Sequence, residues 1–347
     1  MTVLVFIYYM IEHLEKALRQ GIIEKDQFER LVKYNQRLCD NDVPVIYNLR
    51  HIRKIFRIKK KEQNIFFGEE RKSLYQVFTI PKKLGGMRQI EAPCKRLKDI
   101  QRWIKDNVID KAVVSDYAIG FRKNMSIVDN AKKHVQKDLV INMDISNFFP
   151  SISYADIFKM FLYFGYRQDV AHLLTKLCTN GENVLPQGSP ASPSISNHIL
   201  LKLDKRLGRL AESVGADYSR YADDITFSGN ITISSIIPLV GKIIKEEGFE
   251  LNSKKTRLQY KNQRQEVTGL IVNKKVSVPS SLEKELKNAI YFIMKYGIDG
   301  HMNHIGCKKL FYKEHLYGIA YFIKMVEEEK GENYLRKLDD IDWEEKR

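Results

Sequence analysis

The sequence predicts an α+β core that is followed by a helical module at the C-terminal end. Segments that alternate like strands are interspersed with segments of helical period as far as about residue 275, whereas apolar residues recur at helical spacing from Ser281 onward. No repeat of solenoid period is present. With 347 residues, the chain is long enough for one large or two modest domains.

The first 61 residues read as helical and end in the basic run RHIRKIFRIKKK. Several basic residues recur there at helical spacing, namely Arg53, Lys54, Arg57 and Lys61. The run is therefore either a solvated helix face or a helix that follows a phosphate backbone. Residues 74–93 alternate like two strands around the pair Gly85-Gly86, which predicts a β-hairpin.

The middle of the chain mixes both periods. CKRLKDIQRWIKDNVID is helical, and a buried strand runs from Leu139 to Met143 and ends at Asp144. SYADIFKMFLYFG, QDVAHLLTKLC and ISSIIPLVGKIIKEEGF read as helices, and LPQGSPASPSISNHILLKLDKRL as a turn that leads into another. SRYADDITFSG reads as a hairpin with Asp223 and Asp224 at its turn, and EVTGLIVNKKVSV as a return to strand.

The composition favours a polyanionic partner. Lys and Arg number 58 against 43 Asp and Glu, which gives a net charge of +15, so nucleic acid or an anionic membrane surface would be attracted. The four cysteines lie far apart and form no CxxC pair, which argues against zinc and a disulfide framework and indicates reduced cytosolic thiols.

No stretch approaches the ~18 apolar residues of a membrane span. The apolar start TVLVFIYYMI lacks a basic leader and a cleavage site, and it runs on into EHLEKALRQ. A partly buried helix and a cytoplasmic protein without a membrane partner are expected.

The adjacent carboxylates Asp223 and Asp224 repel each other unless a cation or water compensates them. An isolated pair of this kind is most simply a solvated turn. If the strand that ends at Asp144 lies beside the hairpin, however, three carboxylates converge. Oxygen ligands suit Mg²⁺, with Mn²⁺ as an alternative. Two such ions ~4 Å apart support phosphoryl transfer, which fits a nucleic-acid template.

Seven blocks in order now resemble those of a reverse transcriptase over most of residues 74–275. IPKKLGGMRQIEAP and AIGFRKNMSIVDNA are similar to the two fingers blocks. NMDISNFF, LPQGSPASPSISN and YADD are similar to the first three palm motifs, and GFELNSKKT and VTGLIV to the fourth and fifth. The resemblance implies a right-hand polymerase with fingers, palm and a helical C-terminal thumb, and an RNA-directed DNA polymerase activity.

The resemblance also implies roles for single residues. Asp144, Asp223 and Asp224 match the family's metal-binding triad, which holds two Mg²⁺ ions. Lys255 resembles the residue that protonates the departing pyrophosphate, and Lys254 lies next to it. For nucleotide binding, an aromatic gate under the sugar, a close backbone approach and a triphosphate clamp are implied. The residues concerned are Phe149, Gln187, Gly188, Lys82 and Arg88, with Lys83 as a substitute for Lys82 and Phe148 expected in the core.

Two short signatures are similar to those of retron reverse transcriptases: NAKKH, from Asn130 to His134, and VTG, formed by Val267, Thr268 and Gly269. We expect these residues to contact RNA or primer, although His134 could equally be a histidine on a helix surface. The resemblance implies domains at 1–73 (N-terminal helical basic segment), 74–138 (fingers), 139–280 (palm, with the remaining fingers elements) and 281–347 (helical RNA-binding thumb). An RNA-binding thumb fits its interleaved aromatic and basic residues: Tyr291, Tyr296, Lys308, Lys309, Tyr312 and Lys313.

A retron enzyme is expected to use dNTPs to copy part of a cognate non-coding RNA into single-stranded DNA, starting from an internal guanosine 2′-hydroxyl. A separate effector protein, a higher-order complex and a role in antiphage defence are implied. The alternatives are another bacterial reverse transcriptase class, such as a group II intron or diversity-generating enzyme, a template-free defence polymerase, and an inactive RNA-binding scaffold. The acidic end, EEEKGENYLRKLDDIDWEE, is expected to be a solvated helix end.

Overall fold

The computed structural model describes residues 3–82, 85–306 and 311–343. The chain forms two compact units, each assembled from separate stretches of sequence. The first unit contains Met1–Phe121, Ile145–Lys205 and Ile243–Glu250, and the second contains Arg122–Asp144, Arg206–Lys242 and Leu251–Arg347. Helices and strands are mixed, and the described part of the chain ends in helices, so the predicted α+β class with a helical C-terminal module is confirmed.

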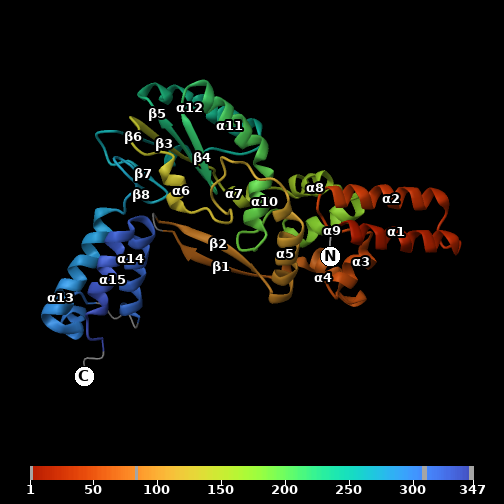
Figure 1. Ribbon diagram of the computed structural model, residues 1–347, viewed down its shortest axis with the longest axis horizontal. Coiled ribbons are helices and arrows are strands. Elements are labelled where there is room, and N and C mark those ends of the chain that lie inside the picture. Colours follow the sequence, from red (N-terminus) through yellow and green to blue (C-terminus); the bar gives the residue numbers. More distant parts are fainter. Residues whose placement is uncertain (1–2, 83–84, 307–310, 344–347) are drawn as a thin grey trace. The chain divides into compact units, whose positions relative to one another are not determined.

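The first unit is mostly helical. Its helices are α1 (Val3–Arg19), α2 (Lys25–Asp40), α3 (Leu49–Ile55), α4 (Gln63–Phe67), α5 (Lys95–Asn107), α7 (Phe148–Ser151), α8 (Tyr154–Tyr163), α9 (Gln168–Cys178) and α10 (Ser192–Ile199). The 3₁₀ turns Lys60–Glu62, Glu69–Leu74 and Ile109–Lys111 connect some of them. α1 and α2 lie side by side (Figure 1). The start of the chain is helical as expected, but the burial of its apolar residues 3–10 lies outside the described side chains.

The basic run RHIRKIFRIKKK does not form one helix, so the expectation of a continuous helix up to residue 61 is wrong. α3 ends at Ile55, and Arg57 adopts a φ of 53°. Such a left-handed conformation is unfavourable for a residue with a Cβ and stops a helix. The Arg53 side chain instead donates to the Ile58 carbonyl at 3.1 Å, across the break.

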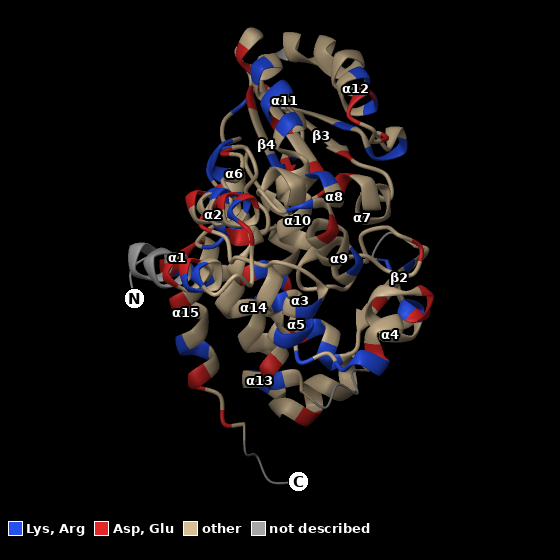
Figure 2. Cartoon of the chain, turned by 90° about the vertical axis from the view of Figure 1, so that its right-hand side faces the viewer, with Lys and Arg blue, Asp and Glu red and all other residues tan. Residues whose placement is uncertain are grey.

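Basic residues gather on α5, which carries five Lys or Arg and two Asp (Figure 2). Several of these cations are paired locally. Lys105 contacts Asp110 at 2.6 Å, and Arg96 contacts Glu62 at 2.5 Å. Neighbouring carboxylates therefore offset part of the positive charge of this helix.

The predicted fingers hairpin is present as β1 (Tyr75–Pro81) and β2 (Met87–Pro93), paired antiparallel with Ile80 opposite Arg88. Gly85 and Gly86 both have positive φ values, 90° and 82°. Only glycine adopts these values readily, which explains why the chain turns at this point.

The second unit contains a four-stranded antiparallel sheet in the order β4-β5-β3-β6 (Figure 1). The strands are β3 (Leu139–Asp144), β4 (Asp217–Tyr221), β5 (Asp224–Gly229) and β6 (Arg257–Tyr260). β3 pairs directly with β5, so the strand that ends at Asp144 does lie beside the Asp223–Asp224 hairpin. α11 (Leu201–Ser213) and α12 (Ile237–Glu246) connect these segments, after a 3₁₀ turn at Ile231–Ile236.

The VTG segment is a short hairpin rather than one strand. β7 (Glu266–Val267) and β8 (Leu270–Ile271) flank a turn in which Thr268 and Gly269 have φ values of 48° and 83°. Two successive positive φ values are typical of a type I′ hairpin turn. Val267 and Leu270 pack with Val128 and Ala131 of α6 (Ile127–Lys132).

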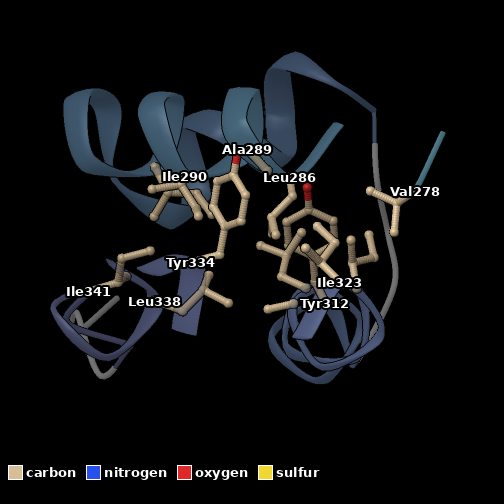
Figure 3. Packing of buried hydrophobic residues seen from close by; sticks show 13 residues of the cluster. Val278, Leu286, Ala289, Ile290, Tyr312, Ile323, Tyr334, Leu338 and Ile341 are labelled. Atoms are coloured by element: carbon tan, nitrogen blue, oxygen red, sulfur yellow. The ribbon is translucent and has the colours of Figure 1, made fainter. Parts of the chain in front are cut away.

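The C-terminal helices are α13 (Ser280–His304), α14 (Tyr312–Val326) and α15 (Glu328–Asp339). Figure 3 shows their shared core, to which Leu286, Ile323, Tyr334, Leu338 and Ile341 contribute. The acidic end is therefore not a solvated helix end, because its apolar residues recur on one face and complete this core. Within the described residues, no helix is both long and apolar enough to cross a membrane.

We expect Leu338→Ala to lower the free energy of unfolding by about 2–5 kcal/mol, because it leaves a cavity in a core where Leu338 is fully buried. Urea titration followed by circular dichroism measures this change. Asn333→Ala, an exposed change on the same helix, should have almost no effect. Equal effects of the two substitutions would contradict a core role for the acidic end.

Candidate active site

The pairing of β3 with β5 places Asp144 directly opposite Asp224. The two residues are 80 positions apart in the chain, but Asp144 ends β3 and Asp224 begins β5 at the same end of the two central strands. Asp144 is buried, whereas Asp224 is exposed and Asp223 is half-buried in the turn before it. Because successive side chains of a strand point to opposite faces, Ile141 and Met143 lie on the face opposite to Asp144. They are buried there with their partners on β5, Phe227 and Ile225.

The turn between β4 and β5 is tight and strained. Tyr221 pairs with Asp224, which leaves only Ala222 and Asp223 in the turn. Ala222 has a φ of 60°, a position that glycine normally takes in such hairpins, and this costs about 1 kcal/mol or more. The fully buried Arg220 donates from Nη1 to the Ala222 carbonyl at 3.0 Å. Sequence reasoning missed Arg220, although it lies two residues after the buried Tyr218 and therefore on the same face of the strand.

Lys255 reaches the same carboxylates from the following segment. The Asn252 amide donates to the Asp144 carbonyl at 2.8 Å, which holds the 3₁₀ turn Ser253–Lys255 beside β3. From there the Lys255 ammonium nitrogen lies 2.8 Å from Asp144 Oδ1. Of the two candidate lysines, Lys255 is thus the one in contact with the carboxylates in this structure.

Burial of its carboxylate among protein atoms and the like charges of Asp223 and Asp144 together raise the pKa of Asp224 to about 6, although the residue as a whole is exposed. Lys255 and Arg257 act in the opposite direction. The negative charge of the three carboxylates is therefore only partly compensated by Lys255 and Arg257.

A divalent cation would supply that charge, and the donor set fits one, because carboxylate oxygens are preferred ligands of Mg²⁺. In the parts of the chain that the structure describes, no three His, Cys, Asp or Glu side chains are already grouped around an ion position. Lys255 contacts one Asp144 oxygen instead, so the ammonium group now provides the counter-charge.

The residues expected to bind the nucleotide lie in the first unit. Phe148 is buried, as expected of a core residue, and Phe149 is half-buried with its ring centroid 5.1 Å from that of Phe148 and 6.4 Å from that of Phe121. Lys82 and Arg88 are exposed on the β1–β2 hairpin, while Lys83 lies outside the described residues. That these side chains and the carboxylates face one nucleotide stays a prediction.

Gln187 and Gly188 lie against the β1–β2 hairpin. The Gln187 carbonyl accepts from the Glu91 amide at 2.9 Å. Gly188 has a φ of 145°, and a Cβ there would lie 2.5 Å from the Glu91 carbonyl oxygen. The glycine is thus required by the close approach of β2, and not only by the approach of a nucleotide that the sequence suggested.

The two signatures lie inside the second unit. Asn130, His134 and Val267 are fully buried, so the expectation that their side chains contact RNA or primer is wrong for this structure, as is a surface position for His134. The His134 ring contacts the hydroxyls of Ser219 and Ser228, both at 2.7 Å. Burial lowers the pKa of His134 to about 3, which keeps the ring neutral. Thr268 is half-buried, and Gly269 is exposed at the hairpin turn.

Comparison with known proteins agrees with these motifs. Residues 80–273 match the family described as reverse transcriptase (RNA-dependent DNA polymerase). The Retron Ec86 reverse transcriptase of Escherichia coli is 34% identical over 87% of this chain and 93% of its own length. This chain belongs to the retron reverse transcriptases.

A second relative agrees with this assignment. The Retron Mx65 reverse transcriptase of Myxococcus xanthus is 33% identical over 77% of this chain, which spans 65% of the Myxococcus protein. A solved telomerase from Candida tropicalis has a TM-score of 0.45 at 11% identity, over 78% of this chain and 58% of the telomerase.

As a retron reverse transcriptase, the chain is an RNA-directed DNA polymerase with a fingers–palm fold and C-terminal helices, as the motifs predicted. Other reverse transcriptase classes and an inactive scaffold are thereby set aside. Reverse transcriptases generally use divalent metal ions.

We expect Asp224→Asn to raise the free energy of unfolding of the metal-free enzyme by about 1 kcal/mol above pH 6, after discounting for solvent screening. The folded-state pKa of about 6 exceeds that of an unfolded aspartate, so the charged form opposes folding. The gain should be absent below about pH 4 and grow as the pH rises to 6.

Urea titrations at several pH values in the presence of a chelator measure this gain. Asp138→Asn is the control, because it removes a carboxylate 3.4 Å from Lys261 and should give no gain. A loss of stability in Asp224→Asn at pH 7 would contradict the repulsion.

Proposed function

We propose that this retron reverse transcriptase copies part of a cognate structured non-coding RNA into single-stranded DNA. Synthesis begins at the 2′-hydroxyl of an internal guanosine, so that the product is DNA joined to RNA at a branch. The opposition of Asp144 and Asp224 across β3 and β5 is the observation that carries the catalytic part of this proposal. The net charge of +15 supports an RNA partner.

In this proposal Asp144, Asp223 and Asp224 hold two Mg²⁺ ions, or Mn²⁺ in their place. When bound, such ions make the attacking hydroxyl more acidic and stabilise the leaving oxygen. Asp144 and Asp224 are fixed by the β3–β5 pairing, and Asp223 by the strained turn. With its contact to Asp144 released, Lys255 would supply a proton from its ammonium group to the departing pyrophosphate.

The first unit positions the dNTP. Lys82 and Arg88 clamp the triphosphate from the exposed hairpin, since fixed cations offset the charge that develops there. The half-buried ring of Phe149 lies under the sugar and collides with a 2′-hydroxyl, which favours deoxynucleotides. Gln187 and Gly188 form the backbone wall of this site, supported by β2.

The C-terminal helices hold the RNA. Tyr291 and Tyr296 are each 56% exposed, and the Lys295 ammonium lies over both rings, at 5.8 and 5.0 Å from their centroids. Exposed rings beside a cation suit the bases and phosphates of an RNA loop. Lys308 and Lys309 lie outside the described residues, whereas Tyr312 is buried and contributes to the core.

In this proposal the N-terminal helical segment is 1–73, the fingers are 74–138, the palm is 139–280 and the thumb is 281–347. We further propose that the enzyme acts in antiphage defence in the cytoplasm. There it forms a complex with its RNA, its DNA product and a separate effector protein, which the complex keeps inactive.

Nucleic acid that co-purifies with the enzyme, expressed from its native locus, tests the proposal. We expect a discrete DNA that a debranching enzyme releases from RNA, and its absence when Asp223→Asn and Asp224→Asn are combined. Asp217→Asn is the matched control, because it changes an acid of the same hairpin that contacts Lys137 at 2.6 Å. It should leave the product unchanged.

Other products would contradict parts of the proposal. Bound RNA without DNA in the wild-type enzyme would contradict synthesis. DNA without a branch would contradict the 2′-hydroxyl start, and DNA without correspondence to the RNA would contradict templated copying.

A further inference from the structure

A chain of hydrogen bonds is buried between α6 and the hairpin that carries Asp223 and Asp224. His134 Nδ1 lies 2.7 Å from Ser228 Oγ, His134 Nε2 lies 2.7 Å from Ser219 Oγ, and Ser219 Oγ lies 2.7 Å from Asn130 Oδ1. All four residues are completely buried. Ser219 belongs to β4 and Ser228 to β5. These hydrogen bonds therefore connect α6 and the segment after it to both strands of the hairpin.

The bonds of this chain have one consistent direction. The single Ser219 hydroxyl proton is donated to Asn130 Oδ1, so Ser219 must accept from a protonated His134 Nε2. A neutral imidazole then carries no proton on Nδ1, and Nδ1 accepts from the Ser228 hydroxyl. The buried pocket keeps the ring neutral, and removal of any member would leave at least one buried donor or acceptor of a neighbour unpaired, which is destabilising.

Local sequence fixes α6 in place for this contact. Ser126 caps the helix: its Oγ accepts from the amides of Val128 and Asp129, and its own amide and hydroxyl donate to the Asp129 carboxylate. This capping box holds the first turn. The Thr268 hydroxyl donates to the Ile127 carbonyl at 3.2 Å, and Val267 packs on the same helix.

The NAKKH and VTG signatures thus form one junction, in which α6 is held between the β7–β8 hairpin and the hairpin of the carboxylates. Ser219 precedes Asp223 by four residues, and Ser228 follows Asp224 by four. Ser219, Ser228 and Asp224 occupy the same face of the sheet, because their strands alternate in register. Motion of the strands at the junction would therefore be transmitted to the turn.

We propose that Asn130 and His134 are positioning residues, which lock β4 and β5 through Ser219 and Ser228 so that Asp223 and Asp224 stay opposite Asp144. The inference rests on the proposed metal-binding role of these three carboxylates. Neither residue touches substrate. Their effect on synthesis is exerted through the position of the turn, and with it through the concentration of Mg²⁺ that synthesis requires.

Two measurements on the full-length enzyme test this role. The first is amide hydrogen exchange of residues 217–229 in the metal-free protein, and the second is the Mg²⁺ concentration that gives half-maximal DNA synthesis. We expect Ser219→Ala and His134→Gln to speed the exchange of this segment and to raise the required Mg²⁺ concentration roughly tenfold. Ser219→Thr, which keeps a hydroxyl, should restore both values towards those of the wild type.

Thr175→Val is the matched control, because it removes a fully buried hydroxyl that donates to the Ala171 carbonyl within α9. It should lower the melting temperature but change neither readout. If His134→Gln does not fold, Ser219→Ala and Ser228→Ala still test each hydroxyl singly.

Asp223→Asn separates the two proposals. If it is inactive while the Ser219 and His134 variants lose only thermal stability, as Thr175→Val does, the positioning role is overturned and the proposed function stands. If Asp223→Asn makes DNA at the wild-type rate, the proposed function itself fails.

Discussion

The antiparallel pairing of β3 with β5 is the contact on which the rest of the site depends. It brings Asp144 opposite Asp224 although the residues are 80 positions apart, and the short turn adds Asp223. A shift of one residue in this register would send the carboxylates to the opposite face of the sheet. The burial pattern opposes such a shift, because it would move the apolar side chains of Ile141, Met143, Ile225 and Phe227 to the face that holds the buried polar side chains of Thr226 and Ser228.

The sheet must also hold three like charges at one end of its central strands. Lys255 offsets part of their repulsion through its 2.8 Å contact with Asp144, while burial and the like charges of Asp223 and Asp144 keep the pKa of Asp224 raised to about 6. Arg220 stabilises the strained turn by donating to the Ala222 carbonyl. The hydrogen bonds of His134 to Ser219 and Ser228 connect both strands of the hairpin to the segment after α6. The turn is thus destabilised by backbone strain and charge repulsion, and the buried contacts around it offset this cost, as is usual at functional sites.

Much of this arrangement could be predicted from sequence because it depends on local patterns. Strand alternation, the Gly85-Gly86 turn and the ordered motifs located β1 to β5 and the carboxylates. Features that depend on tertiary contacts could not be predicted in this way. The helix break at Arg57, the burial of His134 and the place of Leu338 in a core are decided by neighbours distant in sequence. The role of Gly188 also changed, because its constraint comes from the β2 backbone.

Direct measurement of metal binding tests the central claim, that the paired strands build a divalent-cation site. Mn²⁺ bound by the nucleic-acid-free enzyme can be counted by electron paramagnetic resonance in the presence of a dNTP. We predict binding by the wild-type enzyme that is lost in Asp144→Asn and kept in Asp217→Asn. Unchanged Mn²⁺ binding by Asp144→Asn, in a protein that remains folded, would contradict the account.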